Sequence, residues 1–145
     1  MFGLPWGKSH DLSPDTGVIP HISKPNIMFY NLRLVYITTS DREEARSIGK
    51  ALVKERLAAC VNILDGMESI YWWEGELQED SECVLIAKTP YHNMKLLTDR
   101  VKELHSYDCP CIISLQLTEQ EGNEEYQRWL LNEARKQTID YEIED

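Results

Sequence analysis

The chain has 145 residues, a formal net charge of −10 at pH 7 and 42% hydrophobic residues, which suits one globular domain. Its 25 acidic residues against 15 basic ones argue against nucleic acid as a partner, because binding to phosphates needs a cationic face. No apolar run approaches the ~18 residues that span a bilayer, so we expect no membrane insertion.

The two ends of the chain differ in composition from its middle. Residues 1–31 contain several prolines and scattered polar residues, without the cationic start and apolar block of a secretory signal, so we expect a flexible N-terminal extension. Residues 137–145 form an acidic tail, which leaves residues 32–136 as the folded domain. The 4 cysteines include no C-x-x-C pair, and we expect them to stay reduced in a cytoplasmic protein.

The first expected elements are a strand and a helix. Arg33–Thr39 is β-branched and aromatic, which is the composition of a buried strand. Ser40 follows it, and Glu43 three residues later predicts a capping box at the start of a helix. This helix should end near Arg56, and its apolar stripe consists of Ala45, Ile48, Ala51 and Leu52.

A hairpin of two strands is expected next. Ala58–Leu64 has the composition of a second strand, and the Asp-Gly pair at residues 65–66 predicts a kink or bulge after it. Ser69–Trp73 then continues extended, and Glu-Gly-Glu at residues 74–76 predicts a turn. Glu82–Thr89 returns as the third strand.

Two further helices and a fourth strand complete the predicted domain. Thr89 followed by Pro90 predicts an N-cap with proline at the first helical position. Cys111–Thr118 is the fourth strand, and Gly122 with Asn123 opens a last helix. The apolar positions are Met94, Leu97, Val101 and Leu104 in the second helix, and Tyr126, Trp129, Leu130 and Ala134 in the last.

The expected order β-α-β-β-α-β plus a C-terminal helix is that of a ferredoxin-like split βαβ sandwich, an α/β (α+β) fold. In this topology strands 1 and 3 are central, strands 2 and 4 lie at opposite edges, and both crossover helices cover one face. Val35 and Ile37 alternate with Leu34 and Tyr36, so apolar side chains point to both faces. The long edge strand and the uncovered face therefore predict an oligomer.

Five motifs occur in order between about residues 33 and 135, and in them the chain resembles the CutA family of divalent-cation tolerance proteins. They are Leu57–Asn62 (LAACVN), Ser69–Gly75 (SIYWWEG), Lys88-Thr89, His105-x-Tyr107-x-x-Pro110, and Gly122-Asn123-x-x-Tyr126-x-x-Trp129.

The resemblance implies a ferredoxin-like homotrimer, related in architecture to PII signalling proteins, that associates with copper and other divalent cations. We therefore expect a trimeric divalent cation tolerance protein that is not an enzyme, with copper as the candidate metal. The sequence also contains no P-loop, G-x-S-x-G or H-E-x-x-H motif. Two alternatives stay open: a PII-like trimer that senses a small molecule, and a scaffold or anchoring partner of another protein.

Three residues are the candidate metal ligands: Cys60, His105 and Cys111. Thiolate selects soft Cu(I), and imidazole suits copper and zinc. Each residue also has a structural reading, because cysteine is often a small core residue and a histidine in a last helical turn complements the helix dipole. In the family the position of Cys111 is often acidic. Because Cys60 and Cys111 belong to opposite edge strands, roughly 14 Å apart, they can share a metal only across a subunit interface.

The remaining candidate residues are aromatic or basic and are expected at a subunit interface or cleft. Three consecutive aromatic residues in a strand must send side chains to both faces, and large aromatic residues dominate interfaces. Lys88 ends an inner strand, where it either faces an inter-subunit cleft or is solvated. The full set is Tyr71, Trp72, Trp73, Lys88, Tyr107 and Trp129.

Overall fold

The computed structural model describes residues 30–134, so most of the predicted N-terminal extension and the whole acidic tail lie outside the described residues. The described chain follows the predicted element order with one added 3-10 turn. The elements are β1 (Leu32–Thr39), α1 (Arg42–Lys54), β2 (Cys60–Trp73), β3 (Glu76–Pro90), the 3-10 turn η1 (Tyr91–Asn93), α2 (Met94–Leu104), β4 (Ile112–Gln116) and α3 (Glu124–Glu133).

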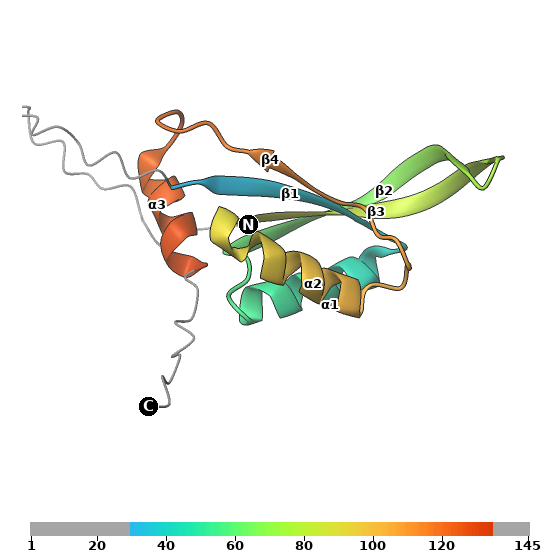
Figure 1. The fold of residues 1–145 in the computed structure, drawn as a ribbon, viewed down its shortest axis with the longest axis horizontal. Coiled ribbons are helices and arrows are strands. Elements are labelled where there is room, and N and C mark those ends of the chain that lie inside the picture. The colour runs from blue at the N-terminus through green and yellow to red at the C-terminus, as the bar shows by residue number, and fades with distance from the viewer. Residues whose placement is uncertain (1–29, 135–145) are drawn as a thin grey trace, which may run out of the picture.

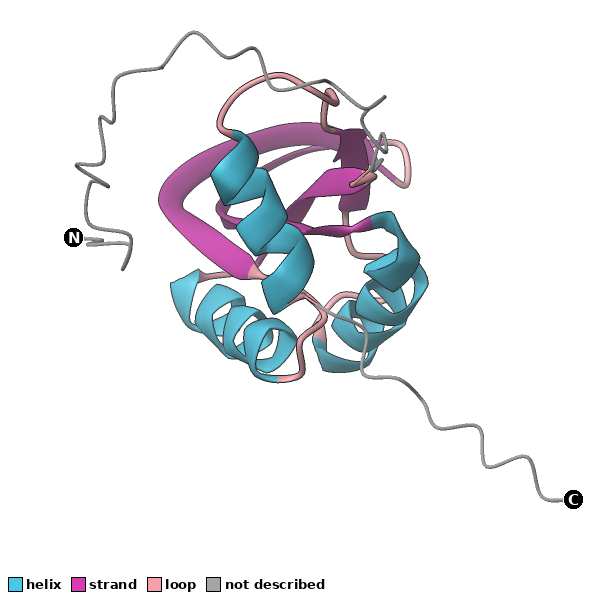
Figure 2. Cartoon of the chain, turned by 90° about the vertical axis from the view of Figure 1, so that its left-hand side faces the viewer, coloured by secondary structure: helices cyan, strands magenta, loops and turns pink. Residues whose placement is uncertain are grey.

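The four strands form one antiparallel sheet in the order β2-β3-β1-β4, as the ferredoxin-like pattern predicts. Figure 1 shows α1 and α2 side by side on one face of this sheet, and α3 at one end of it. Figure 2, turned so that this end faces the viewer, shows the strong curvature of the strands above the helices. The face opposite α1 and α2 is called the open face below.

The core lies between the sheet and the two crossover helices. Alternate residues of β1 and β3 point toward the helices, and Val35, Ile37 and Leu85 are fully buried there. Leu97 and Val101 of α2 meet them, as the helical spacing predicts. A second, smaller cluster lies under α3, where Leu130 and Ala134 pack against Leu32 and Ala59.

The predicted bulge and turn are both confirmed. The pairing of β2 with β3 shifts between Leu64 and Met67, and Gly66 between them has a φ of +80°. The strands then run on to a two-residue turn, Glu74-Gly75, in which both φ angles are positive, as the twist of a tight hairpin requires. Because of this turn β3 starts at Glu76, six residues before the predicted Glu82. The paired residues 67–82 beyond the bulge are called the hairpin arm, and Figure 1 shows the arm projecting past the helices.

The cap of α1 lies one residue later than predicted. Asp41, not Ser40, is the N-cap, and its carboxylate accepts a hydrogen bond from the Glu44 amide at 2.8 Å. The Glu44 carboxylate reaches back to the amide and hydroxyl of Ser40. The cap moves because the Thr39 hydroxyl donates to the Asp41 carbonyl at 2.8 Å, which keeps the first residues after β1 in a turn outside the helix.

The predicted start of the second helix at Thr89-Pro90 is wrong. Both residues belong to β3, and the Thr89 hydroxyl donates to the Leu57 carbonyl at 2.6 Å instead of capping a helix. The helix α2 begins at Met94, after η1. The Asn93 side chain, at the N-cap position of α2, donates to the Ala134 carbonyl at 2.7 Å. Buried carbonyls need donors, and these two side chains provide them.

Candidate functional site

Cys60 lies at the first position of β2, beneath α3. Its Sγ is 3.6 Å from the hydroxyl of Tyr126, and the Lys88 ammonium donates to the same hydroxyl at 3.1 Å. Burial raises the pKa of Tyr126, which the positive charge of Lys88 opposes. The ring of Trp129 packs against Tyr126 with 5.5 Å between centroids. Tyr126 therefore covers both Cys60 and Lys88, and neither side chain is simply solvated.

His105 follows α2 directly and its side chain is fully buried. Its Nε2 lies 2.7 Å from the Thr38 carbonyl, and its Nδ1 accepts a hydrogen bond from the Tyr107 amide at 3.0 Å. A carbonyl can only accept and an amide N–H can only donate, so Nε2 donates to Thr38 and Nδ1 accepts from Tyr107. The Glu44 carboxylate also lies 3.8 Å from Nδ1. Neither ring nitrogen is open to a metal in this arrangement.

Cys111 directly precedes β4, and the exposed Cys109 stands two residues before it. Cys111 is partly buried, and this burial raises the pKa of its thiol. A carboxylate, Glu82, also raises this pKa through its negative charge. Both thiols line one cavity, which joins the loop after α2 to the hairpin arm.

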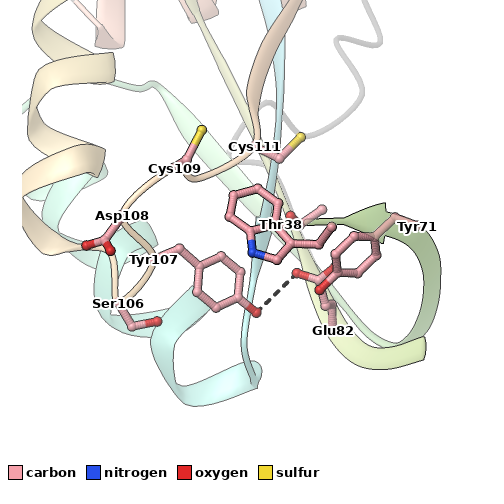
Figure 3. A pocket seen from close by; sticks show the side chains of 9 residues that line it. Thr38, Tyr71, Glu82, Ser106, Tyr107, Asp108, Cys109 and Cys111 are labelled. Atoms are coloured by element: carbon pink, nitrogen blue, oxygen red, sulfur yellow. Dashed lines mark hydrogen bonds between the residues drawn. The ribbon is translucent and has the colours of Figure 1, made fainter. Parts of the chain in front are cut away.

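This cavity has a volume of about 510 Å³. Its walls come from the end of β1, from the hairpin arm and from the loop between α2 and β4. Figure 3 shows Tyr71 and Tyr107 pointing toward each other with the Glu82 carboxylate between them. The Tyr107 hydroxyl donates to Glu82 at 3.3 Å, and the Tyr71 hydroxyl donates to Asp80. Burial, with the charge of Glu82, raises the pKa of Tyr107 to about 12.

The three predicted metal ligands lie in three separate environments. Cys60 starts one edge strand, Cys111 precedes the opposite edge strand, and His105 is hydrogen-bonded below the end of β1. Within residues 30–134 no group of three or more His, Cys, Asp or Glu side chains could hold a metal ion. A single described chain therefore offers no closed metal site.

The aromatic residues of the hairpin arm divide between its two faces. Tyr71 and Trp73 line the cavity, whereas Trp72 does not and is 73% exposed. Ile70 and Leu77 are also exposed, and Leu77 is the cross-strand partner of Trp72. One face of the arm is thus turned toward the cavity, and the other carries an apolar surface.

Sequence reasoning missed Glu82 as a site residue. The only sequence signal was alternation, which places Glu82 on the same face of β3 as Val84 and Ile86. Its partner Tyr107 lies 25 residues later in the loop after α2, so their meeting depends on tertiary structure.

The fold and the site together define a ferredoxin-like α+β domain with a projecting hairpin arm and a cavity at the base of that arm. The CutA1 divalent ion tolerance protein family matches residues 33–133, and the chain belongs to this family.

The relatives share most of the described chain. The divalent-cation tolerance protein CutA of Thermus thermophilus is 53% identical over 97 residues, which is 67% of this chain and 92% of that protein. Protein CutA, chloroplastic, of Arabidopsis thaliana is 44% identical over 102 residues, which is 70% of this chain and 55% of the plant protein. The crystal structure of CutA1 from Oryza sativa matches with a TM-score of 0.70 and 42% identity, over 73% of this chain and 95% of that one.

Among the described residues, no helix has the length and apolar character needed to cross a membrane.

Proposed function

We propose that the protein is a homotrimer that confers tolerance to divalent cations by binding copper or other metal ions, and that it catalyses no reaction. Membership of the CutA1 family supports the tolerance role. The observation that carries the trimer is exposed apolar surface in two places: Ile70, Trp72 and Leu77 on the hairpin arm, and Leu64, Ile113 and Leu115 on the open face. Exposed apolar surface of this extent is typical of an interface.

The sheet edges also support a ring of subunits. The strands β2 and β4 lie at opposite edges, and β2 is 14 residues long. Unpaired edge strands are templates for pairing with another chain. If β2 of one subunit meets β4 of the next, the contact joins two different surfaces, and such a contact closes into a ring when the rotation allows it.

Copper is proposed to bind between subunits as cargo and not as a resident cofactor. Cys60 and Cys111 come from opposite edges, so the contact of β2 with a neighbouring β4 is the arrangement that brings the two thiols together. Cys109 supplies a second thiol beside Cys111. Thiolates favour Cu(I) over Zn²⁺ or Mg²⁺. His105 would first have to release the Thr38 carbonyl or the Tyr107 amide, which makes it the weakest of the three proposed ligands.

Light scattering tests the assembly. We expect a mass of about three times the 16.9 kDa of the chain at micromolar concentration. A stable monomer would contradict the proposed trimer.

Titration of the reduced protein with Cu(I), against a competing chelator, tests the metal role. We expect weaker binding in Cys60→Ser and in Cys111→Ser. Mixed trimers of these two variants should recover some sites, because certain interfaces would pair an intact Cys60 with an intact Cys111. Unchanged copper binding in both single variants would show that these thiols are not ligands.

A second candidate function is a PII-like trimer that senses a small molecule. The observation that favours it is the cavity of about 510 Å³ at the base of the hairpin arm, which is lined by aromatic and acidic side chains. Thermal stabilisation by a small molecule, without stabilisation by copper, would favour this function over metal tolerance.

We also propose a cytoplasmic location. All four cysteines are free thiols in the structure, which fits a reducing compartment. Subcellular fractionation tests it, and recovery with an organelle would contradict it.

A further inference from the structure

The cavity at the base of the hairpin arm combines aromatic walls with negative charge. Tyr71 and Trp73 occupy alternate positions of β2 and so share one face of the strand, and Tyr107 approaches from the loop after α2. Figure 3 shows the Glu82 carboxylate between the two tyrosines. Aromatic rings around a carboxylate are the arrangement by which proteins bind organic ammonium ions, through attraction of the cation to the ring faces.

Hydrogen bonds hold this arrangement in place. The Tyr107 hydroxyl donates to Glu82, and the Tyr71 hydroxyl donates to the neighbouring Asp80. Both phenols therefore donate to carboxylates of β3, and of these two carboxylates Glu82 lines the cavity. A ligand would meet aromatic side chains and the negative charge of Glu82.

The charges of the cavity disfavour an anionic ligand. The lining residues include two carboxylates, Glu82 and Asp108, and no lysine or arginine. The pKa values of Tyr107 and Cys111 are both raised, by burial first and then by the charge of Glu82. Phosphate groups of a nucleotide would be repelled here, because they need donors and positive charge.

We propose that this cavity binds an organic cation, an alkylammonium group held over the rings of Tyr71, Trp73 and Tyr107 and neutralised by Glu82. The proposal rests on the second candidate function, a small-molecule sensor, and the four residues that it uses are not among the proposed copper ligands. Three aromatic side chains offer no ligand atoms suited to a metal ion. An alkylammonium group has a large, weakly hydrated surface, which interacts favourably with aromatic rings. The cavity volume of about 510 Å³ accommodates a small organic ion of this kind.

Calorimetric titration of the full chain with tetramethylammonium chloride tests the proposal. The matched controls are tert-butanol, a neutral molecule of similar shape, and sodium chloride at the same ionic strength. We expect the ammonium ion to bind with a dissociation constant in the millimolar range, which is typical of a small cation on exposed aromatic rings, and neither control to bind measurably.

Variants assign the binding to particular groups. We expect Glu82→Gln to weaken binding about tenfold, and Tyr107→Leu to abolish it. The matched variant is Glu79→Gln, which removes a carboxylate of the same strand outside the cavity and should bind within about threefold of the unaltered chain. Circular dichroism and light scattering confirm that each variant is folded and assembled.

Three results would overturn the proposal: no binding of tetramethylammonium, equal binding of tert-butanol, or unchanged binding in Glu82→Gln. Glu82→Gln keeps the proposal testable even if Tyr107→Leu does not fold. Cys60→Ser separates the two proposals, since Cys60 is a proposed copper ligand outside the cavity: this variant should weaken copper binding and leave ammonium binding intact. If the ammonium ion does not bind, the proposed metal role and the proposed trimer are still tested separately, by the copper titration and by light scattering.

Discussion

The β2–β3 ladder has an inner half and an outer half that share one backbone pairing but differ in their side chains. In the inner half, Leu85 and Ala87 point toward α1 and α2 and are fully buried. In the outer half, the hairpin arm, Trp72 is 73% exposed on one face and Tyr71 is 39% exposed on the other. An isolated two-stranded hairpin is marginally stable in water. The arm therefore needs contacts other than burial against α1 and α2 to be stable.

This difference separates folding from assembly. The inner half gains its stability from burial within one chain, so its residues determine whether the domain folds. The apolar face of the arm gains little within one chain, so we predict that its residues contribute to the proposed association of subunits. The opposite face of the arm forms one wall of the cavity, which links the arm to the proposed binding of a small molecule.

The largest expected effect is in the inner half. Leu85→Ala removes a fully buried side chain and should lower the free energy of unfolding by about 2–5 kcal/mol. The matched variant Leu77→Ala removes the same atoms from the exposed face of the arm and should cost less, with a loss that depends on protein concentration. Urea denaturation at two protein concentrations measures both. An equal, concentration-independent loss in the two variants would remove the distinction between the halves.

The next largest effect concerns the arm. Trp72→Asp places a charge on the apolar surface and should convert the proposed trimer into monomers, a loss of at least about 2 kcal/mol per interface. Trp72→Phe keeps an aromatic ring and should retain the assembly. Light scattering measures the mass of each variant. If Trp72→Asp keeps the mass of the unaltered protein, the arm is not the interface.

A smaller effect is expected where β1 meets the loop between α2 and β4. His105→Ala leaves the Thr38 carbonyl and the Tyr107 amide without their partner and should lower the free energy of unfolding by about 1–3 kcal/mol. Lys102→Ala, on the exposed side of α2, is the control and should change it by less than about 0.5 kcal/mol. Thermal unfolding measures both variants. If His105→Ala leaves the free energy of unfolding unchanged, the two hydrogen bonds contribute nothing to stability.

The smallest effect is a dependence of stability on pH through Glu44. Burial alone would raise its pKa, but hydrogen bonds from Ser106 and Ser40 outweigh burial and lower it below the ordinary value of 4.5. Because the folded-state pKa is the lower one, the stabilisation is complete above pH 4.5 and is lost as the pH falls through the folded-state pKa.

The variant Glu44→Gln measures this contribution. It should cost about 1 kcal/mol or less at neutral pH, and the difference from the unaltered protein should shrink as the pH falls below 4.5. Glu43→Gln, an exposed neighbour in the first turn of α1, is the control. A difference that stays constant across this range would mean that the charge of Glu44 is not what stabilises the fold.

Local signals in the sequence were sufficient for the order of elements, the bulge at Gly66 and the turn at Glu74-Gly75, and all three are confirmed. These features depend on residues close together in the chain, where periodicity and the conformational freedom of glycine act directly. The strand order followed as well, because the ferredoxin-like pattern allows few arrangements.

Local signals failed where a side chain has a distant partner. Thr89 looked like a helix N-cap, but its hydroxyl binds Leu57, 32 residues earlier. His105 directly follows a helix, but the carbonyl that its ring contacts belongs to Thr38, 67 residues earlier. The sequence shows which hydrogen bonds a side chain can make. Its actual partner depends on which distant segments the fold brings together.

The cavity makes the same point for function. The sequence alone was sufficient to identify the family and the fold, and it showed which thiols and aromatic residues are available for a site. Only the tertiary structure placed Glu82 beside Tyr107 and enclosed both with Tyr71, because the hairpin arm and the loop after α2 meet solely through the packing of the sheet on its helices. Side chains that belong to separate motifs in the sequence thus become walls of one site.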